Sequence, residues 1–189
     1  MERVRSFSQG RPLTWADLES FDDDGYRYEI VDGTLLMSPS PRPLHQRVVA
    51  RLLTVLGEHC PRDLEVLPAP VDVVLADDTV LIPDVVVGRR ADFGPRGLMG
   101  APTLAVEVIS RSSRLIDTRL KPARLAQANC PHYWVVDPNV PEIRCFSLGD
   151  ACYAERVVLL GEKVTELIEP YPVRVSAEYL VADYPDDLG

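Results

Sequence analysis

The chain has 189 residues, of which 46% are hydrophobic, and its formal net charge at neutral pH is −9. This length fits one globular domain with a substantial core, and no apolar run reaches the ~18 residues that a membrane span needs. The start of the chain lacks the apolar segment of a signal peptide, and the four cysteines form no CxxC pair. We therefore expect a cytoplasmic protein without a disulfide framework or a zinc knuckle.

The acidic charge is concentrated in two segments. Residues 12–32 carry −6 and the segment from Ser176 onward carries −4, which leaves the rest of the chain at about +1. Within that rest, residues 111–124 carry +4. Nucleic-acid phosphates favour such a basic segment, although a run of charges is as often a solvated helix face. The negative total therefore does not exclude a nucleic-acid partner.

The first elements are marked by capping and turn residues. Thr14 followed by Asp17 predicts the start of a short helix. Residues 26–38 are expected to form a β-hairpin that turns at Asp32-Gly33, a dipeptide that suits a type I′ turn. Apolar residues then recur at helical spacing over about 44–59, which predicts the first long helix.

Strands dominate the rest of the sequence. A glycine-rich segment at 89–100 is expected to be an exposed loop, and a helix is expected to begin near Lys121 and to stop at Asn129. The order of elements predicts a mixed α/β sheet with helices on its faces. The strands are expected at about 64–75 (interrupted by two prolines), 80–87, 103–110, 132–137, 142–148, 152–160 and 163–170.

Three carboxylates lie inside apolar, strand-forming runs. Glu107 stands in "TLAVEVIS", Asp84 in "VLIPDVVVG" and Glu29 in "YRYEIVDG". An ionised side chain in a buried strand is unfavourable unless it meets a cation, a metal or a hydrogen-bond donor. If the strands of Asp84 and Glu107 are neighbours, their oxygens share one site, and hard oxygen ligands favour Mg²⁺ or Mn²⁺ over zinc.

Each of these residues also has a purely structural explanation. Asp84 follows Pro83 and is then a turn or bulge residue, and Glu107 pairs with an arginine on a neighbouring strand. Together they form a buried ionic network without chemistry. We favour the functional interpretation because Lys121, on the following helix, is available to the same pair.

The same residues resemble a known nuclease pattern. Asp84 after Pro83, followed by Glu107-Val108-Ile109, resembles the PD-(D/E)XK nuclease superfamily, except that Ile109 stands where the lysine belongs. Lys121 stands where the Uma-type restriction endonuclease-like family carries a shifted lysine. The resemblance spans about residues 28–138 and rests on an ordered set of segments: "YEIVDGTLLMSPSP" with His45-Gln46, "IPDVVV", "EVISRSSRLIDTRLK" and "PHYWVVDP".

The resemblance implies a fold, a reaction and a metal. The fold would be a restriction endonuclease-like mixed β-sheet core flanked by helices, with an N-terminal β-hairpin. The reaction would be hydrolysis of phosphodiester bonds in DNA, or in RNA, with Mg²⁺ or Mn²⁺. Asp84, Glu107 and the backbone carbonyl of Val108 or Ile109 would hold the metal, Lys121 would orient the attacking water or neutralise charge on the phosphate, and Glu29 would complete the site.

Further residues are candidate contacts to nucleic acid. Arg111, Arg114 and Arg119 would contact phosphates. His45 would approach the scissile phosphate or simply bond a loop carbonyl. A homodimer is expected, because cutting two strands is simplest with paired active sites.

Boundaries and alternatives follow from the same pattern. We expect a single domain over 1–189, with an N-terminal helical segment at 1–27, the core at 28–138, and C-terminal strands with an acidic tail at 139–189. The alternative functions are a catalytically inactive nuclease-fold module that binds or regulates, and a structural α/β protein with a buried charge network.

Overall fold

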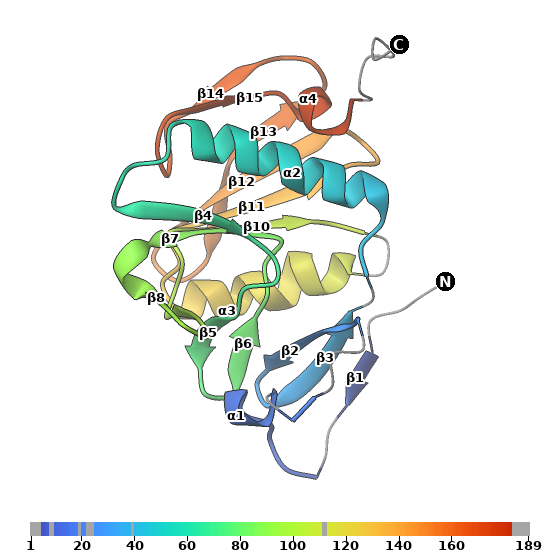
Figure 1. Cartoon of the computed structure of the whole chain (residues 1–189). Helices are drawn as coiled ribbons and strands as arrows, with labels where there is room; N and C mark the ends of the chain where they lie inside the picture. Colours follow the sequence, from blue (N-terminus) through green and yellow to red (C-terminus); the bar gives the residue numbers. More distant parts are fainter. Residues whose placement is uncertain are drawn as a thin grey trace.

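The structure, a computed structural model, describes residues 5–7, 10–18, 20–21, 25–38, 40–110 and 113–182. Within these residues a six-stranded and a seven-stranded sheet lie next to each other, and a short two-stranded sheet packs near the C-terminal end (Figure 1). Among them, no helix is both long and apolar enough to cross a bilayer. All four cysteines are free thiols.

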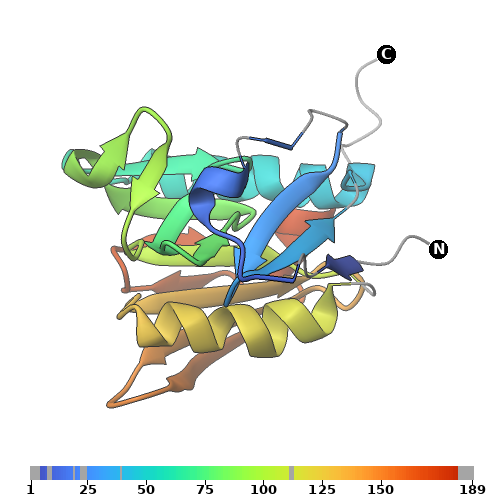
Figure 2. The ribbon, with the colours of Figure 1, turned by 90° about the horizontal axis from the view of Figure 1, so that it is seen from below.

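The six-stranded sheet forms the centre of the molecule. Its middle strands β10 and β11 are parallel, and its other neighbouring pairs are antiparallel. Seen from below, α2 (Pro43–Glu58) lies on one side of this sheet and α3 (Lys121–Gln127) on the other (Figure 2). In spatial order the strands are β13 (Tyr153–Leu160), β12 (Glu142–Leu148), β11 (His132–Asp137), β10 (Leu104–Val108), β7 (Val85–Arg89) and β4 (Leu64–Pro68).

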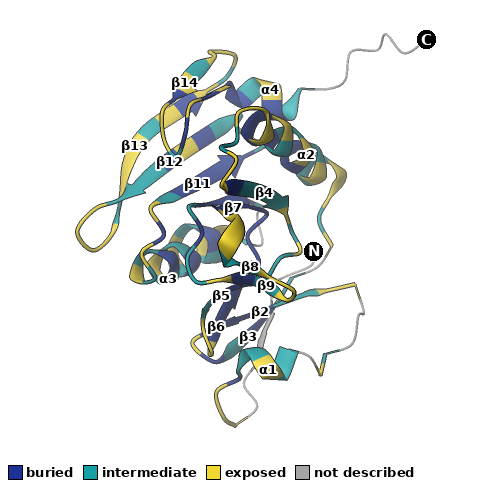
Figure 3. Ribbon diagram, turned by 60° about the vertical axis from the view of Figure 1, so that its left-hand side comes forward, coloured by how far each residue is buried: buried dark blue, intermediate teal, exposed yellow. Residues whose placement is uncertain are grey.

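The two faces of β10 serve two different layers. Leu104, Val106 and Val108 belong to the core that α2 covers, whereas Ala105 packs with Leu125 of α3. Successive side chains of a strand point to opposite faces, so Glu107 lies on the face of α3. β10 is buried along its whole length, and its neighbours β7 and β11 are buried along nearly all of theirs (Figure 3).

The seven-stranded sheet carries the N-terminal hairpin. Its strands β2 and β3 pair antiparallel, and β2 continues the sheet through a single pairing of Ile30 with Val80 of β6. In spatial order the strands are β1 (Arg5–Phe7), β3 (Thr34–Ser38), β2 (Arg27–Val31), β6 (Thr79–Leu81), β5 (Val73–Ala76), β9 (Gly97–Met99) and β8 (Phe93–Gly94).

The remaining elements are short. The helix expected after Thr14 is α1 (Trp15–Leu18), and Thr14 donates its backbone N–H to Asp17 in its first turn. The hairpin of residues 165–175 packs against α2, and the hydroxyl of Tyr171 in its turn donates a hydrogen bond to the Leu56 carbonyl. The other elements are η1 (Arg90–Asp92), a π-helical segment η2 (Ile116–Leu120), β14 (Thr165–Leu167), β15 (Val173–Val175) and α4 (Ala177–Val181).

The structure corrects three boundaries. The strand expected at 80–87 is two strands in different sheets, because Pro83 donates no hydrogen bond and the chain leaves β6 before Asp84. The expected loop at 89–100 forms η1 and the β8–β9 hairpin, and β9 pairs parallel to β5. Helical structure also begins before Lys121, since η2 runs directly into α3. The N-terminal acidic residues 22–24 lie outside the described residues.

The turn of the N-terminal hairpin gives a first testable prediction. Asp32 and Gly33 have φ angles of 49° and 72°, the left-handed values of the expected turn. A Cβ on Gly33 would lie 2.5 Å from the Cβ of Pro12. We therefore expect Gly33→Ala to lower the free energy of unfolding by about 2–4 kcal/mol, through backbone strain and steric overlap. Urea denaturation measures this change.

A second glycine provides the control. Gly57 lies in α2, and a Cβ there would meet no atom within 4 Å. Gly57→Ala should therefore leave stability unchanged or raise it by up to about 1 kcal/mol, because alanine favours the helix. Equal stability of Gly33→Ala and the wild type would contradict the role assigned to this turn.

Candidate active site

Asp84 is positioned by the junction between the two sheets. It stands immediately before β7, whose Val85 pairs with Val106 of β10. Its Oδ2 accepts the backbone N–H of Val108 at 2.9 Å. The sequence predicted Asp84 inside a strand, but the structure places it between β6 and β7. This position brings its carboxylate to the backbone N–H of Val108, the residue that follows Glu107.

Two basic side chains compensate the charge of Asp84. Arg27 of β2 lies with Nη1 3.0 Å from Oδ1, and His45 of α2 lies with Nε2 3.0 Å from Oδ2. Burial raises the pKa of Asp84, but the hydrogen bond from His45 and the charges of His45, Arg27 and Lys121 outweigh it and bring the pKa to about 2. Asp84 is therefore ionised at neutral pH.

His45 thus contacts the candidate catalytic aspartate, and a loop carbonyl is not its partner at Nε2. Its other ring nitrogen, Nδ1, is buried and makes no hydrogen bond with any described residue. The ring lies in the first turns of α2, which brings the N-terminal end of that helix next to Asp84.

Lys121 joins two further carboxylates. Its Nζ lies 2.9 Å from Oε1 of Glu107 and 2.9 Å from Oε1 of Glu29. Oδ1 of Asp117 lies 3.7 Å away. Glu29 also accepts the backbone N–H of Ile82 at 2.6 Å, which ties the hairpin to the segment that leads to Asp84. The Lys121 side chain is buried, so these three acidic groups are its immediate environment.

The charges of this cluster are strongly coupled. Burial lowers the pKa of Lys121, but Glu107, Glu29 and Asp117 raise it well above its usual value, so the ammonium stays charged. Burial raises the pKa of Glu107 well above its usual range and that of Asp117 to about 6. Four carboxylates thus meet two permanent cations, Lys121 and Arg27, and the cluster keeps an excess of acidic groups.

Asp117 reaches this cluster from the π-helical segment η2, one turn before Lys121. Asp117, Lys121 and Leu125 follow one another at intervals of four residues and are all buried. The buried Tyr133 hydroxyl donates to the Asp117 carbonyl at 2.5 Å, which pins the segment against β11. π-Turns are often found at functional sites. The sequence left Asp117 outside the candidate site and predicted only that it anchors a nearby arginine or lysine, and the structure places it 3.7 Å from the Lys121 ammonium.

The sequence analysis also did not identify Arg27 as a site residue. The alternation of side chains along β2 could have identified it. Arg27 and Glu29 lie two residues apart on β2, so their side chains share the face that is turned toward Asp84 and Lys121. An arginine on the same face as a buried glutamate is the expected partner for a second buried acid.

Of the predicted phosphate contacts, Arg114 and Arg119 lie outside this cluster. Arg114 donates to Asp137 at 2.5 Å, and Arg119 is exposed on η2. Arg111 lies outside the described residues. All three stay predictions.

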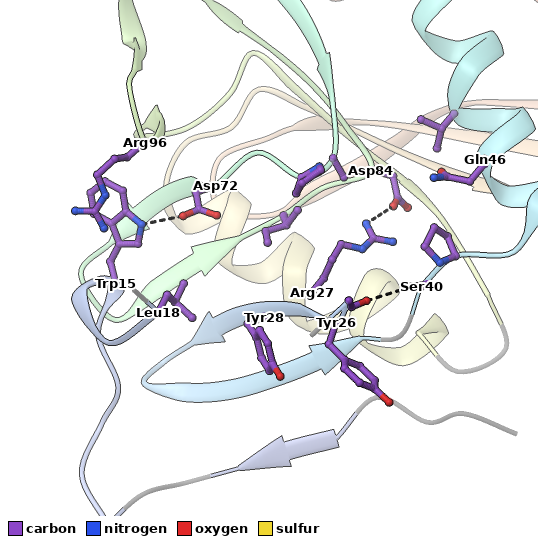
Figure 4. A pocket seen from close by; sticks show the side chains of 16 residues that line it. Trp15, Leu18, Tyr26, Arg27, Tyr28, Ser40, Gln46, Asp72, Asp84 and Arg96 are labelled. Atoms are coloured by element: carbon purple, nitrogen blue, oxygen red, sulfur yellow. Dashed lines mark hydrogen bonds and ion pairs between the residues drawn. The ribbon is translucent and has the colours of Figure 1, made fainter. Parts of the chain in front are cut away.

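An open cleft of about 570 Å³ leads to Asp84 (Figure 4). It runs between α1 and β2 on one side and the segments around Pro70 and Ile82 on the other. Arg27 and Asp84 lie at one end, and Trp15 and Arg96 lie at the opposite end (Figure 4). Asp84 is thus the acidic group through which the buried cluster meets a space that a ligand can enter.

The acid dependence of stability tests the environment of Asp84. A lowered pKa in the folded state stabilises the fold above the unfolded pKa, and this contribution is lost as the pH falls through about 2. We expect Asp84→Asn to be less stable than the wild type by about 2 kcal/mol at pH 7, and the difference to shrink below about pH 4. Urea denaturation at several pH values measures it.

The control for this prediction is Asp63→Asn, at an exposed position in the turn before β4. It should change stability little at any pH. A difference between Asp84→Asn and the wild type that does not vary with pH would argue against an ionised, paired Asp84.

Comparison with known proteins places this geometry in a family. The model of the Uma2 family, described as "Putative restriction endonuclease", matches residues 15–178. The chain belongs to the Uma2 family. The match includes every residue of the cluster around Lys121 and Asp84. No curated protein matches this Uma2 chain significantly.

A solved structure shares the fold of this Uma2 protein. A crystal structure of "a putative nuclease belonging to DUF820" from Anabaena variabilis ATCC 29413 superposes with a TM-score of 0.70 at 14% sequence identity. The match covers 90% of this chain and 98% of the other. At this identity the likeness shows the mixed α/β fold.

The carboxylates of the Uma2 site are oxygen donors of the kind that a divalent cation such as Mg²⁺ prefers. Among the described residues, no group of three or more His, Cys, Asp and Glu side chains has a metal-binding arrangement. A metal here would take Asp84 and Glu107 and complete its ligands with backbone oxygen and water, as Mg²⁺ commonly does.

Proposed function

We propose that this Uma2 protein is a metal-dependent endonuclease that hydrolyses phosphodiester bonds in DNA. The observation that carries the proposal is the meeting of Asp84, Glu107 and Lys121. Asp84 binds the backbone of Val108, the neighbour of Glu107, and Lys121 binds Glu107 directly. This arrangement of two acids and a lysine at the end of a cleft suits phosphodiester hydrolysis, and membership of the Uma2 family supports it.

Each residue has a separate task in this proposal. Asp84, Glu107 and the Val108 carbonyl would hold Mg²⁺ or Mn²⁺, which when bound polarises the phosphoryl oxygen and lowers the pKa of a water molecule. Lys121 is kept charged by its acidic neighbours, so it stabilises negative charge and does not accept a proton. Glu29 orients Lys121 from the hairpin.

The rest of the fold supports the same assignment. We interpret the six-stranded sheet between α2 and α3 as a restriction endonuclease-like core within a single domain over 1–189. Arg111, Arg114 and Arg119 remain candidate phosphate contacts, and the expected homodimer stays a prediction.

A nuclease assay tests the proposal. The full chain is incubated with plasmid, linear duplex, single-stranded DNA and RNA, in Mg²⁺, in Mn²⁺ and in EDTA. We expect cleavage of DNA that depends on the divalent metal and is absent in EDTA. The proposal fails if no DNA substrate is cut in either metal, or if cutting persists in EDTA.

One observation favours a second candidate, an inactive nuclease-fold module. Asp84 is already compensated by Arg27 and His45, and Glu107 by Lys121, so the cluster is a folded ionic network without a metal. Calorimetric binding of Mg²⁺ without turnover of any nucleic acid would support this candidate. If the protein neither binds Mg²⁺ nor cleaves nucleic acid, the cluster is favoured as a purely structural ionic network.

A further inference from the structure

We propose that the cleft in front of Asp84 accepts an unpaired DNA strand, so that the substrate class is single-stranded or locally unpaired DNA. This inference rests on the proposed function and specifies its substrate. Three observations support this inference: the volume of the cleft, the low exposure of Asp84, and the side chains at the two ends of the cleft.

Size and depth exclude an intact duplex from the inner end. The cleft measures about 570 Å³, within the range of pockets that hold one small ligand. Asp84 is only 5% exposed, and Glu107 and Lys121 behind it are 2% and 4% exposed. A duplex is a stiff rod whose two strands travel together. A phosphate can reach Asp84 through this cleft only on a strand that has separated from its partner.

The end of the cleft far from Asp84 is suited to a nucleobase. The guanidinium of Arg96 lies over the ring of Trp15, 4.0 Å from its centre. The Trp15 indole N–H donates to Asp72 at 2.9 Å, which fixes the orientation of the ring. Aromatic rings and guanidinium planes are the groups on which unpaired bases stack. A base would extend the stack of Trp15 and Arg96.

Apolar side chains and the inner end of the cleft complete the match. Leu18 and Ile82 also line the cleft and offer apolar contact to a base or sugar. At the inner end Arg27, which binds Asp84, offers a positive charge to the phosphate. The cleft thus offers apolar side chains, an aromatic ring with a guanidinium on which a base can stack, and one cation beside Asp84. These groups fit a single strand of DNA.

The charges of the cleft predict how this strand binds. Arg27 and Arg96 are balanced by Asp84 and Asp72, so the cleft carries no strong net positive charge. Affinity should therefore come largely from stacking, and it should fall less steeply with salt than is typical of proteins that bind many phosphates.

Binding is measured without turnover, on the full chain in EDTA. The probes are a fluorescein-labelled DNA strand of about eight nucleotides, the corresponding duplex, and the RNA strand. We expect the single DNA strand to bind at least about tenfold more tightly than the duplex, and to quench the fluorescence of Trp15. Trp134 is 1% exposed and should remain unquenched.

Variants locate the binding to the cleft. Trp15→Leu and Arg96→Ala should each weaken single-strand binding by about tenfold, the effect of losing one stacked base. Trp15→Phe keeps a ring and should restore most of the affinity. Arg62→Ala removes an equal charge at an exposed position outside the cleft and should have no effect. Thermal melts establish that each variant is folded.

The outcomes separate this inference from the nuclease proposal. Single-strand binding in the cleft without cleavage in any metal would refute the nuclease and leave the ligand class standing. Equal binding and cutting of duplex, or wild-type affinity in folded Trp15→Leu and Arg96→Ala, would refute the inference and leave the nuclease standing. Preference for RNA, or no binding of any strand, would also overturn the inference.

Discussion

Glu107→Gln is expected to abolish metal-dependent DNA cleavage, with a loss on the order of 10³-fold or more, while the protein stays folded. The substitution removes a carboxylate that the metal would need and keeps the shape of the side chain. Burial raises the pKa of Glu107 well above its usual range, and the charge of Lys121 opposes this shift. Lys121 keeps Glu29 and Asp117 as acidic neighbours. Cleavage rates in Mg²⁺ and a thermal melt of each protein measure the two effects.

Two comparisons sharpen this experiment. Glu162→Gln, at an exposed position, makes the same chemical change and should leave cleavage unaltered. Asp84→Asn should also abolish cleavage, but it additionally destabilises the fold because Arg27 and the Val108 N–H lose an ionised partner. Glu107→Gln is therefore the cleaner test. Full activity of folded Glu107→Gln would show that this glutamate is no metal ligand.

The second large effect is expected on stability. Lys121→Met should lower the free energy of unfolding by about 3–5 kcal/mol at pH 7, because it leaves buried acids without their cation. Methionine matches the length and the apolar stem of the lysine, so the loss reports the charge. The acids are Glu29 and Glu107, each 2.9 Å from the ammonium, and Asp117 at 3.7 Å. Urea denaturation measures the difference.

The pH dependence of Lys121→Met follows from the same carboxyl groups. The pKa values of Glu107 and Asp117 are already raised by burial, that of Asp117 to about 6, and removal of Lys121 raises them further. Groups with a raised pKa bind protons on folding, so a lower pH favours the folded variant. The deficit should therefore be smaller at pH 5 than at pH 8.

Lys163→Met is the matched control, since Lys163 is exposed on the turn before β14. It should change stability by less than about 0.5 kcal/mol. Wild-type stability of Lys121→Met at pH 7 would mean that the three acids are neutral in the fold, and it would remove the basis for a charged Lys121 at the site.

Local chemistry was sufficient for several elements of this protein. The turn at Asp32-Gly33 could be predicted because both residues tolerate a positive φ. The apolar period of α2 and the apolar run of β10 likewise specify their own conformation and burial. The segments around Asp84, Glu107 and Lys121 also identified the family, because their order along the chain is specific.

Other boundaries depended on partners that are distant in sequence. The segment at 89–100 forms a hairpin because β9 finds the edge of β5. Asp84 leaves the expected strand because Pro83 separates a strand of one sheet from a strand of the other. A periodic pattern indicates that a face is buried, but it does not name the strand that will pair with it.

The sequence by itself determined that three acids stand in buried strands, that a lysine follows them on a helix, and which family has this pattern. Only the tertiary structure decided which side chains contact each other. Asp84 contacts Arg27, His45 and the Val108 N–H. Lys121 contacts Glu29, Glu107 and Asp117. It also created the cleft between Trp15 and Asp84. The physical reason is that periodicity and turn preference act over a few residues, whereas a site is made by contacts across sheets whose order those local rules leave open.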